Sequence, residues 1–300
     1  MDIWKSEVWK DKYKDHNVRK GLRLKFDRGI DEKLKTGFKE YCRWLRSEYT
    51  FPIRVPVYVK NFKKIKAMDG EYVFGTFLGP FNFLEEPYVR VAAGDFKESF
   101  EEMGEQAVYQ YLCTLTHELT HYFQWLNNSE LTQIGKERQA TITADRIVQR
   151  YVDAKYEEKQ QFLHKLEQSA KRREINEAEI DKLRKIAFED DVNNKILIAR
   201  ILEESKLIES EKILLHLTKD IDDVVRMEAC NALSNSDSLE VYEALKGIAS
   251  KDSVGMVRGY AIVALGDVAV EINKEKEATK FLKNLLKREK TDFAIIDIWA

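Results

Sequence analysis

The chain has 300 residues, of which 50 are basic and 52 acidic, so its formal net charge at pH 7 is only −2. A nearly neutral chain gives no electrostatic reason to bind nucleic acid or a membrane surface, and we expect neither as a partner. The length allows two domains, each with its own core.

The cysteine content and the apolar runs indicate the compartment. Cys42, Cys113 and Cys230 are odd in number and far apart, which argues against a disulfide framework. The N-terminus has no apolar run typical of a signal peptide, and no run of about 18 apolar residues occurs elsewhere. The sequence therefore predicts a soluble, cytoplasmic protein.

The first half of the chain shows a charged segment, one helix and three candidate strands. Residues 1–29 are strongly charged, and we expect them to form a short docked helix or to be partly loose. Apolar residues at helical spacing predict an amphipathic helix over 30–49. Candidate strands follow at 53–60, 71–78 and 87–93, of which the first alternates apolar with other residues.

The stretch TLTHELTHYFQWL reads as a helix, because it lacks Gly and Pro and its apolar residues are spaced by three and four. His117 and His121 lie one turn apart on one face, so both imidazoles can hold the same small cation. Glu118 is displaced around the helix, where its carboxylate can act on a water molecule at the metal. This pattern predicts a zinc hydrolase with Zn²⁺ as cofactor and Glu118 as the catalytic base.

A helix, a small sheet and an H-E-x-x-H helix together resemble the zincin metallopeptidases over residues 30–152, and HELTH is also the form found in thermolysin-like enzymes. The resemblance implies an α+β domain with a short mixed sheet and active-site helices. It also implies that an extended peptide substrate lies antiparallel on the strand before the active-site helix, at the edge of the sheet. This role falls on Tyr88, Val89, Arg90, Val91, Ala92 and Ala93.

A catalytic zinc site usually has three protein ligands, so a third is required. We expect a second helix at about 136–151, and the gluzincin branch of the zincins has a ligating Glu at the start of such a helix. Glu137 fits this place, and the string ERQA that it begins resembles the E-x-x-A of those families. Asp145 is the alternative ligand. It lies eight residues later, about 12 Å along the helix axis, so the two cannot hold one ion together.

Several other residues near the motif have open roles. Thr141 stands where several gluzincins have an Asp that orients a ligand, and its hydroxyl is a weaker acceptor for an imidazole N–H. Cys113 shares the face of the two histidines, although a Cys there is more often a small buried side chain. His164 would be the third ligand of a three-histidine site. Tyr151 is a candidate donor to the oxyanion.

The second half repeats itself with a period of 32 residues. A shift by this length superposes Ile213 on Leu245, Asp220 on Asp252, Val225 on Val257, Arg226 on Arg258, Ala229 on Ala261, Ala232 on Ala264 and Leu233 on Leu265. Each unit reads as a helix, a turn with an Asp placed to cap the next helix, and a second helix opening with Val-Arg. The pattern resembles HEAT-type repeats, which implies a protein partner on the array.

The sequence thus predicts four segments: a charged N-terminus (1–29), a zincin-like domain (30–152), a helical connector (153–190) and an all-α HEAT-like solenoid (191–300). The last unit stops inside a helix at IIDIWA, so we expect a fragment or an end covered by a partner. We interpret the chain as a zinc metallopeptidase that hydrolyses peptide bonds in a protein or peptide substrate. The alternative is a non-catalytic binding scaffold with a structural or vestigial zincin-like domain.

Overall fold

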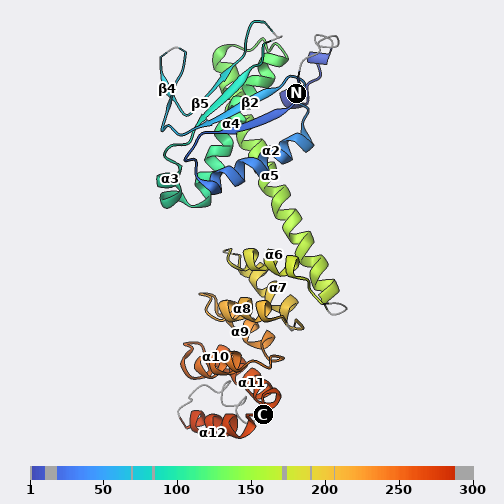
Figure 1. The fold of residues 1–300 in the computed structure, drawn as a ribbon, viewed down its shortest axis with the longest axis vertical. Helices are drawn as coiled ribbons and strands as arrows, with labels where there is room; N and C mark the ends of the chain where they lie inside the picture. Colours follow the sequence, from blue (N-terminus) through green and yellow to red (C-terminus); the bar gives the residue numbers. More distant parts are fainter. Residues whose placement is uncertain are drawn as a thin grey trace. The chain divides into compact units, whose positions relative to one another are not determined.

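A computed structural model describes residues 2–10, 19–68, 70–82, 85–170, 174–189, 191–205 and 207–287 (Figure 1). Most of the expected last repeat, including IIDIWA, lies outside these described residues. The chain divides into two compact units, Met1–Tyr156 and Glu157–Ala300. The long helix α5 (Gln133–Ala170) contributes residues to both units.

The first unit combines a small mixed sheet with helices, as the sequence predicts. Its other elements are η1 (Ile3–Lys5), β1 (Leu22–Phe26), α2 (Glu32–Glu48), β2 (Val55–Lys60), β3 (Ile65–Lys66), β4 (Tyr72–Val73), β5 (Gly75–Leu78), β6 (Tyr88–Ala92), α3 (Phe96–Met103) and α4 (Glu105–Leu126). The main sheet has the order β1-β2-β6-β5, in which β5 alone is antiparallel to its neighbour. The strand expected at 71–78 is divided, because β4 pairs with β3 in a separate hairpin while β5 joins β6.

The N-terminal segment belongs to this unit, which corrects the boundary that we placed after residue 29. Leu22–Phe26 pairs in parallel with β2 and extends the sheet. Trp4 is buried, and its indole N–H donates to Thr120 Oγ1 at 3.0 Å. Arg23 and Lys25 alternate with apolar residues, as in a half-buried strand. The strand was not predicted, because the high charge of residues 1–29 outweighed this short alternation.

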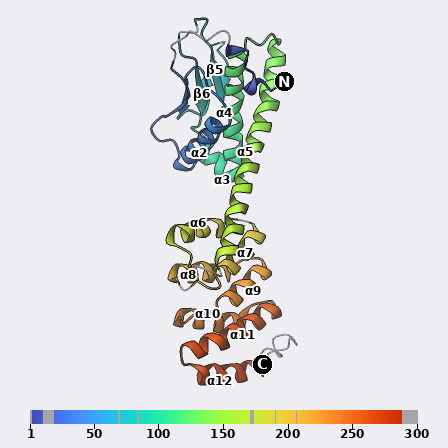
Figure 2. The same ribbon diagram turned by 90° about the vertical axis from the view of Figure 1, so that its right-hand side faces the viewer.

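Two amphipathic helices build the core beside the sheet. The predicted apolar face of α2 is confirmed, since Leu34, Phe38, Tyr41, Cys42 and Leu45 are buried. The predicted stripe of α4 is also buried at Leu112, Leu115, Leu119, Tyr122 and Leu126. On α4, Cys113, His117 and His121 are only partly buried, and contacts with α5 lie on this side (Figure 2). The packing of α4 therefore fixes the direction in which both histidines point.

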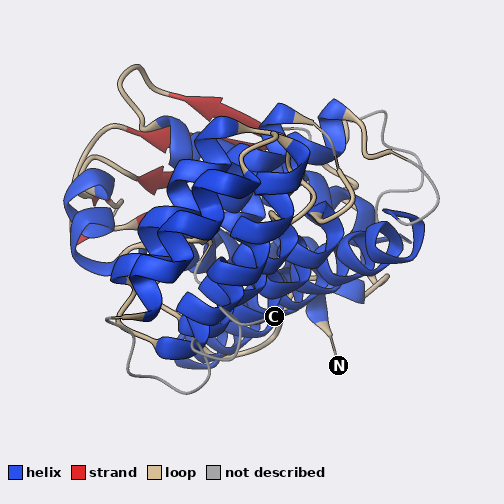
Figure 3. Cartoon of the chain, turned by 90° about the horizontal axis from the view of Figure 1, so that it is seen from below, coloured by secondary structure: helices blue, strands red, loops and turns tan. Residues whose placement is uncertain are grey.

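The second unit contains the stacked helices α6 (Glu177–Ala187), α7 (Val192–Leu202), α8 (Ile208–Leu217), α9 (Asp223–Ala232), α10 (Leu239–Lys251), α11 (Gly255–Glu271) and α12 (Glu275–Leu286) (Figure 2). Helices make up most of the described chain (Figure 3). Ile180 and Leu183 of α6 are buried in the same core as the later helices. The array therefore begins before residue 191, and only part of 153–190 serves as a connector. No helix in the described part of the chain is both long and apolar enough to cross a membrane.

The repeated turn aspartates connect neighbouring repeats and do not cap helices as we expected. The N-cap of α9 is Asp222, whose side chain accepts the Val224 and Val225 N–H groups. Asp220 instead pairs with Lys195 at 2.7 Å. Asp252 pairs in the same way with Arg226 at 2.8 Å. The capping expectation was wrong, because each carboxylate forms an ion pair with a basic residue one repeat earlier.

These paired aspartates predict that the array loses stability in acid. Burial alone would raise the pKa of Asp220 and Asp252. The hydrogen bonds from Lys195 and Arg226 and from the turn N–H groups outweigh this effect, so the pKa of both groups is lowered. Their stabilising contribution is complete above about pH 3.9, the value of an unfolded Asp, and is lost as the pH falls through the lower folded pKa. Urea unfolding followed by circular dichroism between pH 7 and pH 3 should show this loss. An Asp220→Asn/Asp252→Asn variant should lose less stability over the same range, and an equal loss would contradict the assignment.

Candidate metal centre

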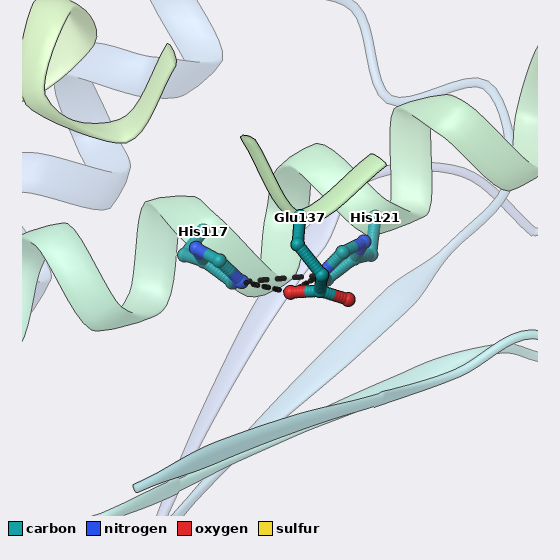
Figure 4. A group of neighbouring side chains, drawn as sticks. All are labelled: His117, His121 and Glu137. Atoms are coloured by element: carbon teal, nitrogen blue, oxygen red, sulfur yellow. Dashed lines mark hydrogen bonds and ion pairs between the residues drawn. The ribbon is translucent and has the colours of Figure 1, made fainter. Parts of the chain in front are cut away.

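Three side chains from α4 and α5 converge on one point (Figure 4). His117 Nε2 lies 3.1 Å from His121 Nε2 and 3.2 Å from Glu137 Oε2, and His121 Nε2 lies 3.5 Å from the same oxygen. Both histidines come from successive turns of α4, and Glu137 comes from the start of α5. The structure thus brings together the residues that the sequence singles out as ligands.

The spacing and chemistry of this group fit zinc. With metal–ligand distances of about 2.0–2.2 Å, the ligand atoms of a tetrahedral zinc site lie about 3.3–3.5 Å apart, close to the separations found between these three atoms. Burial, with the neighbouring His121, lowers the pKa of His117 and so favours the neutral imidazole that a metal requires. Among the described residues, no lysine or arginine forms a salt bridge with Glu118 or Glu137. A divalent cation would supply the missing positive charge.

Gln124 orients one of the histidines, a role that we considered for Thr141. The Gln124 side chain is buried, and its Nε2 donates to Lys136 O at 2.9 Å and to Gln139 Oε1 at 3.0 Å. Its Oε1 therefore faces His121 Nδ1 at 2.8 Å and accepts the proton there, which leaves Nε2 available for a metal. Thr141 instead donates to Glu137 O at 3.0 Å. The signal for Gln124 in the sequence is its place three residues after His121, on the same side of the helix.

Gln124 gives the first prediction at this site. Gln124→Met keeps the length of the side chain but removes the acceptor, and we expect it to weaken zinc binding about 10–100-fold, as is typical when a ligand loses its orienting partner. Gln139→Met is the matched control, because it removes only a partner of the Gln124 amide and should change the affinity less than threefold or so. A competitive zinc titration measures both. Equal affinities for Gln124→Met and the unmodified protein would show that Gln124 has no orienting role.

Glu118 is buried beside the three residues, with 8% of its surface exposed. Burial, together with the charge of Glu137, raises the pKa of Glu118 to about 8. Its carboxyl group packs against the backbone of β5, where a Cβ on Gly75 would lie only 2.7 Å from Glu118 Oε1. The absence of a side chain at Gly75 therefore leaves room for the candidate base.

A cavity of about 1170 Å³ opens over this group. It is lined by β5 and the loop after it, by the His117–His121 side of α4 and by the start of α5. We expected Tyr88–Ala93 to be the substrate strand at the edge of the sheet, but β6 is hydrogen-bonded to β2 on one side and to β5 on the other. The edge strand that lines the cavity is β5 (Gly75–Leu78), and β1 forms the opposite edge of the sheet. The sequence did not reveal this order, because it does not show that β2 pairs with β6 and so leaves the short strand β5 on the outside.

The structure places the other candidate residues away from the ligand group. Asp145 lines the cavity but accepts a hydrogen bond from Tyr109 OH at 2.8 Å. Tyr151 is buried in the core, 4.9 Å from the Tyr41 ring, which corrects its assignment to the oxyanion. His164 lies in the second unit, with Nε2 2.7 Å from Gln168 Nε2. Cys113 borders the cavity without joining the ligand group.

Comparison with known protein families finds a match for one part of the second unit. Residues 180–266 match the family of HEAT repeats, which confirms the repeat prediction for this part and includes most of α6. No curated protein and no solved structure matches the chain. The zincin-like nature of the first unit therefore stays a prediction that depends on its motif and its geometry.

Proposed function

We propose that the first unit is a zinc-dependent peptidase. The observation that carries this proposal is the convergence of His117, His121 and Glu137 beside a buried carboxyl group in an open cavity. A structural zinc site is usually closed by four protein ligands, whereas a catalytic one has three and an open position. The three residues would hold the ion and leave one position for the reaction.

The proposed reaction assigns a separate role to each part of the site. His117, His121 and Glu137 would hold the zinc ion, which when bound would supply Lewis acidity toward the substrate carbonyl and a water molecule. Glu118 takes the proton of the attacking water and gives it to the leaving amine. Gln124 holds His121 in the tautomer that binds metal. The packing of Gly75 against Glu118 keeps the base beside the cavity.

The substrate that fits the cavity best is an extended peptide. β5 lines the cavity and ends the sheet, so a peptide can add to it as a further strand through main-chain hydrogen bonds. Antiparallel pairing is the arrangement that the zincin resemblance implies. A segment that enters in this way has to be extended and free of other pairing on the side that meets β5, as an unfolded or flexible segment is.

Cleavage of a peptide library tests the proposal. The full chain is stripped of metal with a chelator, divided into zinc-loaded and metal-free samples, and incubated with peptides of varied sequence whose products are identified by mass spectrometry. We expect cleavage only in the zinc-loaded sample. If neither sample cleaves any peptide, although zinc is bound, the peptidase proposal fails.

A second function is a protein-binding scaffold, and the HEAT match favours it. HEAT arrays expose extended surfaces along stacked helices and are typical of protein interaction. In that case the zinc site would have a structural role, or none. Removal of zinc would then change at most the stability of the protein, and no peptide would be cleaved with or without zinc. This outcome separates the scaffold from the enzyme.

A further inference from the structure

The cavity carries charged groups that the proposed reaction does not use. Two contacts show that α4 and α5 run in opposite directions along it: Gln124 Nε2 donates to Lys136 O at 2.9 Å, and Tyr109 OH donates to Asp145 Oδ1 at 2.8 Å. In the sequence of α4, His117 and His121 lie between Tyr109 and Gln124. The cavity thus extends from a Lys136 end, past the metal centre, to an Asp145 end.

These two ends differ in charge. Apart from Glu118 and Glu137, Lys136 and Asp145 are the charged residues that line the cavity. Among the residues that the structure describes, neither forms a salt bridge. The groups of α4 that meet Asp145 are uncharged: the Tyr109 hydroxyl donates to it, and burial and the charge of Asp145 raise the pKa of Cys113 to about 11 and keep its thiol protonated. The Asp145 end therefore presents one carboxylate without a cationic partner in the described chain.

The direction of β5 determines which part of a peptide would meet this carboxylate. Gly75, at the start of β5, packs on Glu118, and Gly79, just after its end, packs on Trp125. β5 therefore runs in the same direction as this part of α4. A peptide antiparallel to β5 runs the opposite way, so its residues after the scissile bond lie at the Asp145 end.

We propose that Asp145 selects substrates with a lysine or arginine at the first or second position after the scissile bond. This inference rests on the proposed peptidase function and names the class of peptide that the site prefers. Asp145 lies two helical turns beyond Glu137, about 12 Å along the axis. One or two extended residues cover about 3.5–7 Å of this distance, and a long basic side chain covers the rest. The charge-assisted pair would favour such peptides about tenfold over their neutral analogues.

Binding and cleavage measurements together test this selectivity. Pairs of peptides that differ only by lysine or methionine at these positions are titrated into the zinc-loaded, full-length Glu118→Gln protein, and the unmodified protein is used to map cleavage sites. We expect the lysine peptides to bind about tenfold more tightly. Asp145→Asn should abolish the difference, and Asp145→Lys should reverse it, so that the methionine peptides bind more tightly than the lysine peptides. Asp153→Asn, an exposed Asp on α5 that does not line the cavity, should retain the preference.

Each other outcome overturns a defined part of the account. Cleavage without any charge preference, or a preference that survives Asp145→Asn, overturns the inference but not the peptidase. A preference for basic residues before the scissile bond overturns it as well, because the peptide would then run parallel to β5. If the unmodified protein cleaves no peptide, the proposed function fails and the inference fails with it.

Discussion

Replacement of Glu118 by glutamine is expected to lower kcat/KM for peptide cleavage by about 10²–10⁴-fold and to leave zinc bound. Glutamine has the size of glutamate and keeps one acceptor oxygen, but its amide cannot take a proton from the attacking water and give it to the leaving amine. The side chain is buried against Gly75, so an isosteric change should leave the packing intact. Initial rates on a peptide that the protein cleaves, together with zinc content by mass spectrometry, measure both effects.

The control for this variant is Glu101→Gln, which makes the same chemical change on an exposed side chain of α3. It should match the unmodified protein in rate and in zinc content. If Glu118→Gln also cleaves at the full rate, another residue is the base. If neither protein cleaves peptides while both bind zinc, the scaffold function is favoured.

Replacement of Asp252 by alanine is expected to lower the free energy of unfolding of the repeat array by about 3–5 kcal/mol. Asp252 binds Arg226 through two hydrogen bonds, Nε to Oδ2 at 2.8 Å and Nη2 to Oδ1 at 3.0 Å. The side chains of Arg226 and Asp252 are only 12% and 10% exposed. Without Asp252, the guanidinium would remain buried with no counter-ion, and the Val254 N–H would lose its acceptor.

Urea unfolding of the full chain, followed by circular dichroism, measures this loss. Arg200→Ala is the control, because Arg200 forms a similar pair with Glu228 but is 56% exposed, and exposed pairs contribute about 0–1 kcal/mol. Arg226→Met combined with Asp252→Leu should recover much of the stability, since it leaves no buried charge. Equal, small effects of Asp252→Ala and Arg200→Ala would contradict this account of the turns.

The ligand geometry was predictable because it depends mainly on the period of one helix. A separation of four residues places His117 and His121 on one face, whatever the rest of the chain does. Glu137 needed the resemblance as well, because the approach of α5 to α4 is a tertiary contact. Gln124 was missed for the same reason: its partners Lys136 and Gln139 lie on α5, and the sequence does not show which residues of two helices meet.

Strand order and the role of the turns were less predictable. Each strand has its own pattern of alternation, but the order in the sheet follows from long-range pairing, so β6 was taken as the edge in place of β5. β1 was not predicted, because Arg23 and Lys25 belong to a highly charged segment that reads as exposed to solvent. The repeat of Asp220 at Asp252 was visible, yet its partners, Lys195 and Arg226, lie one repeat earlier in the chain. Local reasoning therefore assigned these residues to helix caps.

Zinc titration of the metal-free full chain tests the metal centre most directly, with His117→Ala, His121→Ala and Glu137→Gln as variants. We expect the unmodified protein to bind one zinc ion per chain. Each variant should bind it at least about 100-fold more weakly, because two remaining ligands hold zinc poorly. Circular dichroism of each variant verifies that the fold is retained. An unmodified protein that binds no zinc under zinc-replete conditions, or three variants that bind it with unchanged affinity, would contradict the account.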